Sequence, residues 1–308
     1  MQSFHFRIWV CCFLGLLSLP VKAQVSVRIL GIAQDAGFPQ AGCNKACCRQ
    51  FYSGQLPAAH PVSLAIVDSN TAKYWLVEAT ADLPQQLHAL GGSGTALKMP
   101  AGIFITHAHM GHYAGLLQLG REAMNAQQLP VYAMPRMKDF LTHNGPWSQL
   151  LQLQNIVLQP LQHQQHVILT SHLSIVPLLV PHRDEFSETV GYLLQGPNKK
   201  LLFIPDIDKW EKWTMPIDSL ISTVDYALLD ATFFDATELP GRNMQEIPHP
   251  FVAESLQRFN ALPAPEKSKI IFVHFNHTNP LLQPNSTATQ KVLQAGFRIA
   301  KEGMQLQL

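Results

Sequence analysis

Three histidines, His107, His109 and His112, stand within six residues of one another, directly after the short apolar run 103–105. Such a run is typical of a buried strand, and good helix formers downstream indicate that a helix begins near Gly111. We therefore expect the imidazoles on a loop between a strand and a helix, where sheet proteins place functional groups. Imidazole is the commonest neutral ligand for zinc, and this spacing lets three rings converge on one ion. A His-rich surface loop is the alternative interpretation.

A metal held by histidines needs more protein ligands than one loop supplies. Single donor residues follow three later apolar runs that read as strands, namely His182 after 173–179, Asp206 after 200–204, and His274 at the end of 270–274. Taken singly, each has a structural explanation, because Asp206 could cap a turn and His182 could lie on a surface loop. Together with the first motif they favour one metal site built from strand ends.

The run HAHMGH at 107–112 resembles the signature of the metallo-β-lactamase superfamily, H-x-H-x-D-H, with Gly111 where the family has aspartate. The resemblance implies that His107, His109 and His182 bind one ion, that Asp206 bridges, and that His112 and His274 bind a second. It also implies that Asp206 and His274 belong to the catalytic machinery. We expect one or two catalytic ions, with zinc first and iron or manganese as alternatives.

The glycine at position 111 removes one carboxylate from the second ion. A carboxylate from elsewhere could replace it, and the sequence offers two candidates, Asp35 after the first predicted strand and Asp184 just past His182. The alternative for each is an exposed loop acid.

The cysteines that follow the first predicted strand indicate a second kind of metal site. Cys43, Cys47 and Cys48 are clustered and odd in number, which makes a poor disulfide framework. The runs GFPQ at 37–40 and HFNHTNP at 274–280 resemble the pyrroloquinoline-quinone biosynthesis protein B branch and the cyclic-phosphate phosphodiesterase of phosphonate breakdown. Those relatives carry a structural C-x-C-x-x-C zinc cluster, whereas this chain reads C-x-x-x-C-C. The resemblance implies a closed zinc site of Cys43, Cys47, Cys48 and His277; the alternative is buried thiols, with Cys47 or Cys48 uninvolved.

The N-terminal segment and the composition indicate where the protein is located and which partners it lacks. The protein has 308 residues, 47% of them hydrophobic and 14% charged, with a net charge of +1, which argues against a nucleic-acid or anionic-lipid partner. Residues 1–23 have a basic start at Arg7, an apolar run at 8–19 and small residues before Gln24, which predicts a signal peptide. An uncleaved anchor is the alternative. We therefore expect a secreted or periplasmic protein, residues 24–308 forming a single metallo-β-lactamase-like domain without stable membrane insertion.

The remaining pattern predicts an α/β fold. Strands are expected at 25–31, 63–68, 74–78, 103–105, 131–133, 155–158, 173–179, 190–195, 200–204, 226–230 and 270–274, with a last strand pair in the tail. Helices are expected at 83–90, 135–141, 251–259 and 288–295. Two batches of strands interleaved with helices favour two facing sheets with helices outside, which agrees with the four-layer αβ/βα sandwich that the resemblance implies.

The preferred function is that of an exported metal-dependent hydrolase acting on an ester, phosphodiester or lactone-type bond of a small molecule. Arg183 or a backbone amide would stabilise developing negative charge, and Trp210 and Trp213 either wall the pocket or pack in the core. An iron-dependent oxidase or hydroxylase, and a non-catalytic metal- or ligand-binding protein, are the alternatives. The sequence determines neither the substrate nor the oligomeric state.

Overall fold

A computed structural model describes residues 25–91, 99–239, 241, 243 and 246–308, and this part of the chain forms two mixed β-sheets. The strands of the first sheet are β1 (Val25–Gly31), β2 (Ser63–Asp68), β3 (Lys73–Val77), β4 (Ile103–Phe104), β5 (Leu129–Ala133), β6 (Ile156–Pro160) and β14 (Gln305–Gln307). Their spatial order is β14-β1-β2-β3-β4-β5-β6, and the pairs from β3 to β6 are parallel.

The second sheet uses the strands of the second half of the chain. These are β7 (Val167–Thr170), β8 (Leu173–Leu179), β9 (Val190–Gln195), β10 (Lys200–Ile204), β11 (Tyr226–Asp230), β12 (Ile270–Val273) and β13 (Arg298–Ile299). They lie in the order β13-β12-β11-β10-β9-β8-β7, with parallel pairing from β10 to β13.

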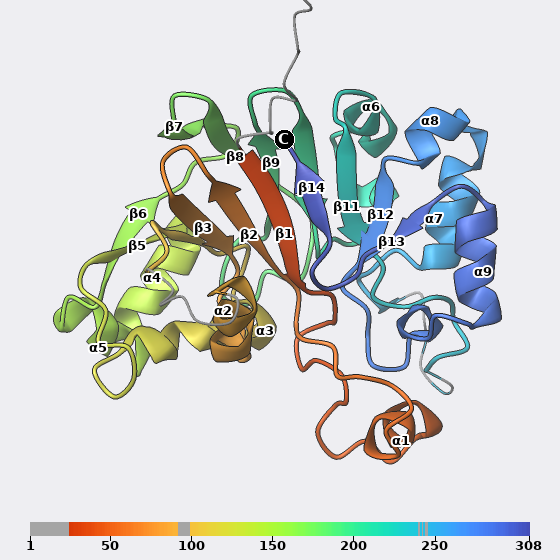
Figure 1. The fold of residues 1–308 in the computed structure, drawn as a ribbon, viewed down its shortest axis with the longest axis horizontal. Coiled ribbons are helices and arrows are strands. Elements are labelled where there is room, and N and C mark those ends of the chain that lie inside the picture. The colour runs from red at the N-terminus through yellow and green to blue at the C-terminus, as the bar shows by residue number, and fades with distance from the viewer. Residues whose placement is uncertain (1–24, 92–98, 240, 242, 244–245) are drawn as a thin grey trace, which may run out of the picture.

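Most of the helices flank the two sheets (Figure 1). They are α1 (Ala46–Tyr52), α2 (Leu83–Gly91), α3 (Met110–Tyr113), α4 (Pro135–His143), α5 (Trp147–Gln152), α6 (Ile217–Ser222), α7 (Val252–Arg258), α8 (Ala264–Lys267) and α9 (Thr287–Gln294). In Figure 1, α2 to α5 accompany the first sheet and α6 to α9 the second, while α1 stands apart from both.

Alternation of side chains along the strands builds the layers. On β2, Leu64 and Ile66 point into the core between the sheets, where they join Tyr192 and Leu228 of the second sheet. The intervening Ala65 belongs to a separate core under the helices of the first sheet. Successive strand residues face opposite sides of a sheet, so a strand with apolar residues at both parities is covered on both faces. The expected four-layer αβ/βα sandwich is confirmed.

Strand direction brings distant residues to one edge of the sandwich. Because β10, β11 and β12 are parallel neighbours, the residues that follow them leave the second sheet at the same edge. Two antiparallel steps separate β8 from β10, so β8 also ends there. Carboxyl ends of parallel strands are where such sheets carry their binding sites.

The tail departs from the expected strand pair. β13 pairs with β12, whereas β14 pairs with β1 in the other sheet. The chain changes sheets through a turn at 300–304, in which the N–H of Ala300 donates to the carbonyl of Phe272 and the N–H of Gly303 to that of Ile29. Two strands were thus correctly predicted, but they close the edges of different sheets.

The helix expected near Gly111 is short. α3 is a single turn, and the chain continues as a 3-10 helix, η1 (Ala114–Leu119). The close approach of this segment to the chain after β3 requires a glycine, because a Cβ at Gly115 would lie 1.9 Å from the carbonyl oxygen of Thr80.

Within the described residues, every helix is too short or too polar to cross a bilayer. The signal peptide predicted at 1–23 lies outside the described residues and stays a prediction, which N-terminal sequencing of the mature protein would test by finding Gln24 first.

Candidate metal centre

The first group of ring nitrogens comes from two loops, one after β4 and one after β8. The ligand atoms of His107, His109 and His182 all lie within 4.8 Å of one another. Nε2 of His107 is 2.8 Å from Nδ1 of His109, and the side chain of His182 is fully buried. The structure therefore brings together the three histidines expected to share an ion.

The second group is arranged around Asp206. Its Oδ2 lies 3.2 Å from Nε2 of His112 and 3.1 Å from Nε2 of His274, while its Oδ1 lies 3.6 Å from Nε2 of His182. The two oxygens of one carboxylate thus face the two groups of histidines. This is the position that the sequence analysis expected for a bridging ligand.

Several of these atoms are buried and make no hydrogen bond. They are Nε2 of His112, both ring nitrogens of His182, Oδ2 of Asp206 and Nε2 of His274. Buried polar atoms without partners cost free energy, so their grouping around the two oxygens of Asp206 calls for bound ligands. Donor atoms bound at about 2.1 Å to a tetrahedral ion stand roughly 3.4 Å apart. The spacings of 3.1 to 3.6 Å around Asp206 fit a divalent cation.

A buried glutamate orients the loop histidines. Glu78 follows β3 and is fully buried. Its Oε1 accepts a hydrogen bond from the hydroxyl of Thr106 at 2.6 Å and lies 3.1 Å from Nδ1 of His112. The Thr106 hydroxyl also lies 2.9 Å from Nδ1 of His107. One carboxylate therefore fixes the rings of two candidate ligands, as outer partners of metal-bound histidines do.

A second supporting group stands beneath His274. The Thr232 hydroxyl lies 2.9 Å from Nδ1 of His274 and donates to Oδ1 of Asp230 at 2.7 Å. The other oxygen of Asp230 lies 2.8 Å from Nδ1 of His249. Sequence reasoning missed His249, which no strand end or motif marked. It could have found Asp230, because this aspartate ends a buried strand between those that precede Asp206 and His274.

Burial and charge set the protonation of the centre. Burial lowers the pKa of His107 well below its usual value, and it lowers the pKa of His182 to about 3, so both rings are neutral donors. Burial acts in the same direction at His112, but Glu78 and Asp206 beside it raise its pKa well above the usual value. These two carboxylates favour positive charge at the ring, and a bound cation would supply that charge.

A cavity of about 580 Å³ adjoins the centre. It is lined by Gln34, Arg183, Phe233, Leu239, Asn243, Glu246, Ile247, Pro248 and His249. His249 connects the cavity to the centre, since its Nδ1 is 3.9 Å from Oδ1 of Asp206. Arg183, one of the two groups that the sequence analysis offered for stabilising developing negative charge, lines this cavity.

The two tryptophans that could have formed a wall of the substrate pocket lie away from the cavity. Trp210 and Trp213 are buried in the core of the second sheet, where their ring N–H groups donate to the hydroxyl of Ser255 and to the carbonyl of Leu179. Core packing is therefore the correct interpretation of this pair, and the pocket-wall interpretation is wrong. Aromatic rings three residues apart on one helical turn reach the same side, here the apolar interior.

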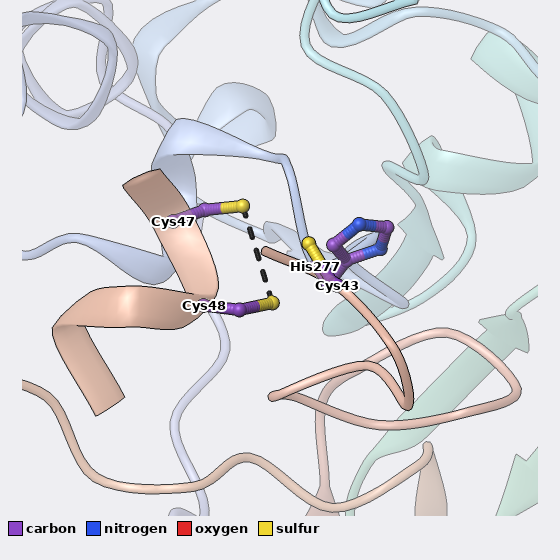
Figure 2. A group of neighbouring side chains, drawn as sticks. All are labelled: Cys43, Cys47, Cys48 and His277. Carbon is purple, nitrogen blue, oxygen red and sulfur yellow. Dashed lines mark hydrogen bonds between the residues drawn. The ribbon is translucent and has the colours of Figure 1, made fainter. Parts of the chain in front are cut away.

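The cysteine cluster lies outside this centre and includes the expected histidine. The ligand atoms of Cys43, Cys47, Cys48 and His277 are all within 4.8 Å of one another. Figure 2 shows Cys47 and Cys48 on the first turn of α1, with their sulfur atoms 4.0 Å apart and facing Cys43 and His277. Sulfur ligands of a tetrahedral zinc stand roughly 3.8 Å apart. Nδ1 of His277 is buried without a hydrogen bond, so the four side chains fit a zinc ion.

Comparison with known sequences agrees with the geometry. The profile of the Beta-lactamase superfamily domain matches residues 74–275, more than half of the chain. The chain belongs to this superfamily. Coenzyme PQQ synthesis protein B from Klebsiella pneumoniae is 27% identical to this chain, in an alignment that covers 92% of this chain and 98% of the Klebsiella protein. The protein of the same name from Methylococcus capsulatus is 26% identical to this chain, and the alignment covers 92% of this chain and 99% of that protein.

Solved structures of the superfamily share the fold. Zn(2+)-bound PqqB from Methylobacterium extorquens aligns with a TM-score of 0.78 at 22% identity, covering 92% of this chain and all of that one. A diphosphatase of the PhnP family aligns with a TM-score of 0.67 at 20% identity, covering 92% and 96%. Human tRNase Z, short form, aligns with a TM-score of 0.56 at 14% identity, covering 91% and 98%. At these identities the likeness concerns the fold.

Proposed function

We propose that this protein is a metal-dependent hydrolase that cleaves an ester bond of a small molecule, with a phosphodiester as the favoured substrate class. The observation that carries the proposal is the convergence of buried, unpartnered donor atoms on Asp206 beside a cavity. Among the superfamily structures that share the fold are a diphosphatase and tRNase Z, which supports phosphoester chemistry.

His107, His109 and His182 would hold one ion, His112 and His274 a second, and Asp206 both. A divalent ion in this position polarises a substrate oxygen and lowers the pKa of bound water to about 7. Asp206 would also accept a hydrogen bond from the attacking water, and Glu78 keeps the rings in place through Thr106 and His112.

Two of the cavity side chains, Arg183 and His249, can bind an anionic group. Arg183 is half exposed and carries no carboxylate within 3.5 Å in the described structure, its Nε being 3.9 Å from Oε1 of Glu185. It can therefore pair with a phosphoryl group that enters the cavity. His249, held by Asp230, is placed to hydrogen-bond an oxygen of the same group.

The test is turnover of bis(p-nitrophenyl) phosphate, with a simple lactone as a second substrate, by protein loaded with zinc or manganese. We expect hydrolysis by the native protein and a loss of at least about 100-fold in His109→Ala, because that change removes a ligand. His143→Ala is the matched control, since His143 is an exposed histidine of α4, 68% accessible. Absence of turnover with either metal, or full activity in His109→Ala, would refute the proposal.

An iron-dependent oxidase or hydroxylase is the second candidate, and the similarity to a protein named for the synthesis of coenzyme PQQ keeps it open. A site of histidines and carboxylates also suits iron that activates oxygen. Metal analysis of protein purified without added zinc separates the two functions. Stoichiometric iron together with oxygen uptake would favour the oxidase, whereas zinc or manganese with phosphodiester turnover would favour the hydrolase.

A further inference from the structure

We propose that Asp35 is a ligand of the second ion and supplies, from the loop after β1, the carboxylate that position 111 lacks. The site would then consist of Asp35, His112, Asp206 and His274. This assignment rests on the metal centre of the proposed function and names a ligand that the first motif does not contain.

Asp35 occupies the space that a side chain at position 111 would need. A Cβ built on Gly111 would lie 2.2 Å from Cα of Asp35 and 2.6 Å from its Oδ1. The clash at Cα involves backbone, so a side-chain rotation cannot relieve it. The backbone N–H of Gly111 donates to Oδ1 of Asp35 at 3.3 Å. The glycine and the carboxylate that lies against it are therefore two parts of one arrangement.

The Asp35 carboxylate also faces an unpartnered ring nitrogen. Its Oδ1 is 3.5 Å from Nε2 of His112, which is buried and makes no hydrogen bond. The donor atoms of Asp35 and His112 are thus 3.5 Å apart. Those of His112 and Asp206 are 3.2 Å apart, and those of Asp206 and His274 are 3.1 Å apart. Each of these three distances is close to the roughly 3.4 Å expected between two donor atoms that bind the same ion. Asp35 would thus add a second carboxylate to the donors of the second ion.

The loop that carries Asp35 is fixed on both sides. The N–H groups of Ile32 and Ala33 each donate to the carbonyl of His60 at 2.9 Å. On the other side, the N–H of Gln34 donates to the carbonyl of Phe275 at 2.8 Å, and the side chain of Asn276 donates to that of Gln34 at 2.6 Å. Phe275 directly follows the ligand His274, so the same contacts position both donors. A loop held in this way delivers the carboxylate without further ordering.

The other carboxylate that the sequence offered is engaged elsewhere. Oδ1 of Asp184 accepts a hydrogen bond from the hydroxyl of Thr189 at 3.0 Å, and the carbonyl of Asp184 accepts one from Arg136. Asp184 therefore serves the fold of its own loop, and Asp184→Asn is a matched control for Asp35→Asn.

The experiment measures metal binding directly. Native protein, Asp35→Asn and Asp184→Asn are stripped, reloaded with zinc and titrated against a chelator of known affinity, with zinc per chain determined by elemental analysis. We expect Asp35→Asn to bind the second ion of the centre at least about 10-fold more weakly, while the first ion and the cysteine-bound ion remain. Asp184→Asn should match the native protein. An unchanged affinity for the second ion in Asp35→Asn would overturn the assignment.

A second variant guards against loss of folding. Asp35→Glu retains a carboxylate, so it should bind the second ion more tightly than Asp35→Asn, whereas a purely structural role would favour the isosteric asparagine. If Asp35→Asn fails to fold, two centre ions in Asp35→Glu support the assignment and a single ion overturns it. If the native protein shows no turnover but Asp35→Asn still loses the second ion, the hydrolase function is refuted. The assignment of Asp35 as a ligand is then retained.

Discussion

At the scale of single residues, the centre depends on buried side chains that hold the ligands in place. Glu78 and His274 show this in their backbones, because their φ angles of 76° and 69° lie in the left-handed region that non-glycine residues rarely adopt. Such conformations cost about 1 to 3 kcal/mol each and persist where the surrounding contacts enforce them. Here the enforced conformations aim one carboxylate and one imidazole at the same centre.

Replacing Glu78 by glutamine should weaken metal binding. The change removes the negative charge beside Nδ1 of His112 and replaces one of the two oxygens that accept hydrogen bonds from the hydroxyl and the N–H of Thr106. We expect about a 10- to 100-fold loss of affinity for the second ion, the range usual for outer partners of metal ligands. Chelator competition measures it, with Glu122→Gln as control because Glu122 is 68% exposed on the surface. Equal affinities of the two variants would contradict this role.

At the scale of elements, the chain after β1 is shaped by the segment before β2. Gly31 is required there, because a Cβ would lie 1.9 Å from the carbonyl oxygen of Pro61. His60, whose carbonyl holds the loop of Asp35, is itself fixed by its ring, which lies 2.7 Å from Oδ2 of Asp82. The hydrogen bond to Asp82 raises the pKa of His60 above its usual value, although partial burial opposes this.

This pair predicts a pH dependence of stability. Because folding raises the pKa of His60, its contribution is complete below the unfolded pKa of about 6.5 and is lost as the pH rises through the higher folded pKa. The free energy of unfolding of the native protein relative to His60→Gln should therefore decrease between pH 6 and pH 8. We expect a change below about 1 kcal/mol, since both side chains are partly exposed. Chemical denaturation of metal-free protein measures it, and a difference that grows with pH would contradict the sign.

At the scale of the whole molecule, the cysteine cluster connects parts that are far apart in the chain. Cys43, Cys47 and Cys48 belong to the segment between the first two strands of one sheet, and His277 follows β12 of the other. α1 stands away from the sandwich in Figure 1, and only a small core around Phe38 and Cys48 packs beneath it. A zinc ion there would therefore compensate for a small apolar contact area.

Removal of one sulfur should reduce both the zinc content and the stability. Cys48→Ser is expected to lose one zinc per chain and to lower the Tm by about 5 °C or more, because structural zinc contributes several kcal/mol to folding. Elemental analysis and thermal unfolding measure the two effects. The neighbouring variant Lys45→Ala should keep its zinc. Unchanged zinc content in Cys48→Ser would instead support buried thiols.

The fold could be predicted in outline because its strands carry strong local patterns. β1, β2, β8, β9, β10 and β11 agree with the expected ranges to within one residue. The elements with weak patterns were missed: α1, α5, α6, α8 and the edge strand β7 are four to seven residues long, which is too short to establish a period. Contacts with the sheets, rather than local preference, determine such elements.

The amino-acid sequence by itself determined which chemistry is present: a histidine run after a buried strand, single donors at later strand ends, and a cysteine cluster with a distant histidine. Only the tertiary structure decided which carboxylate stands at Gly111, that His249 and Glu78 belong to the centre, and that the tryptophans do not. Side-chain types follow from local sequence, whereas approach of Asp35 to Gly111 depends on hydrogen bonds between segments separated by up to 242 residues. Neither segment encodes that contact alone, because it forms when both sheets have packed.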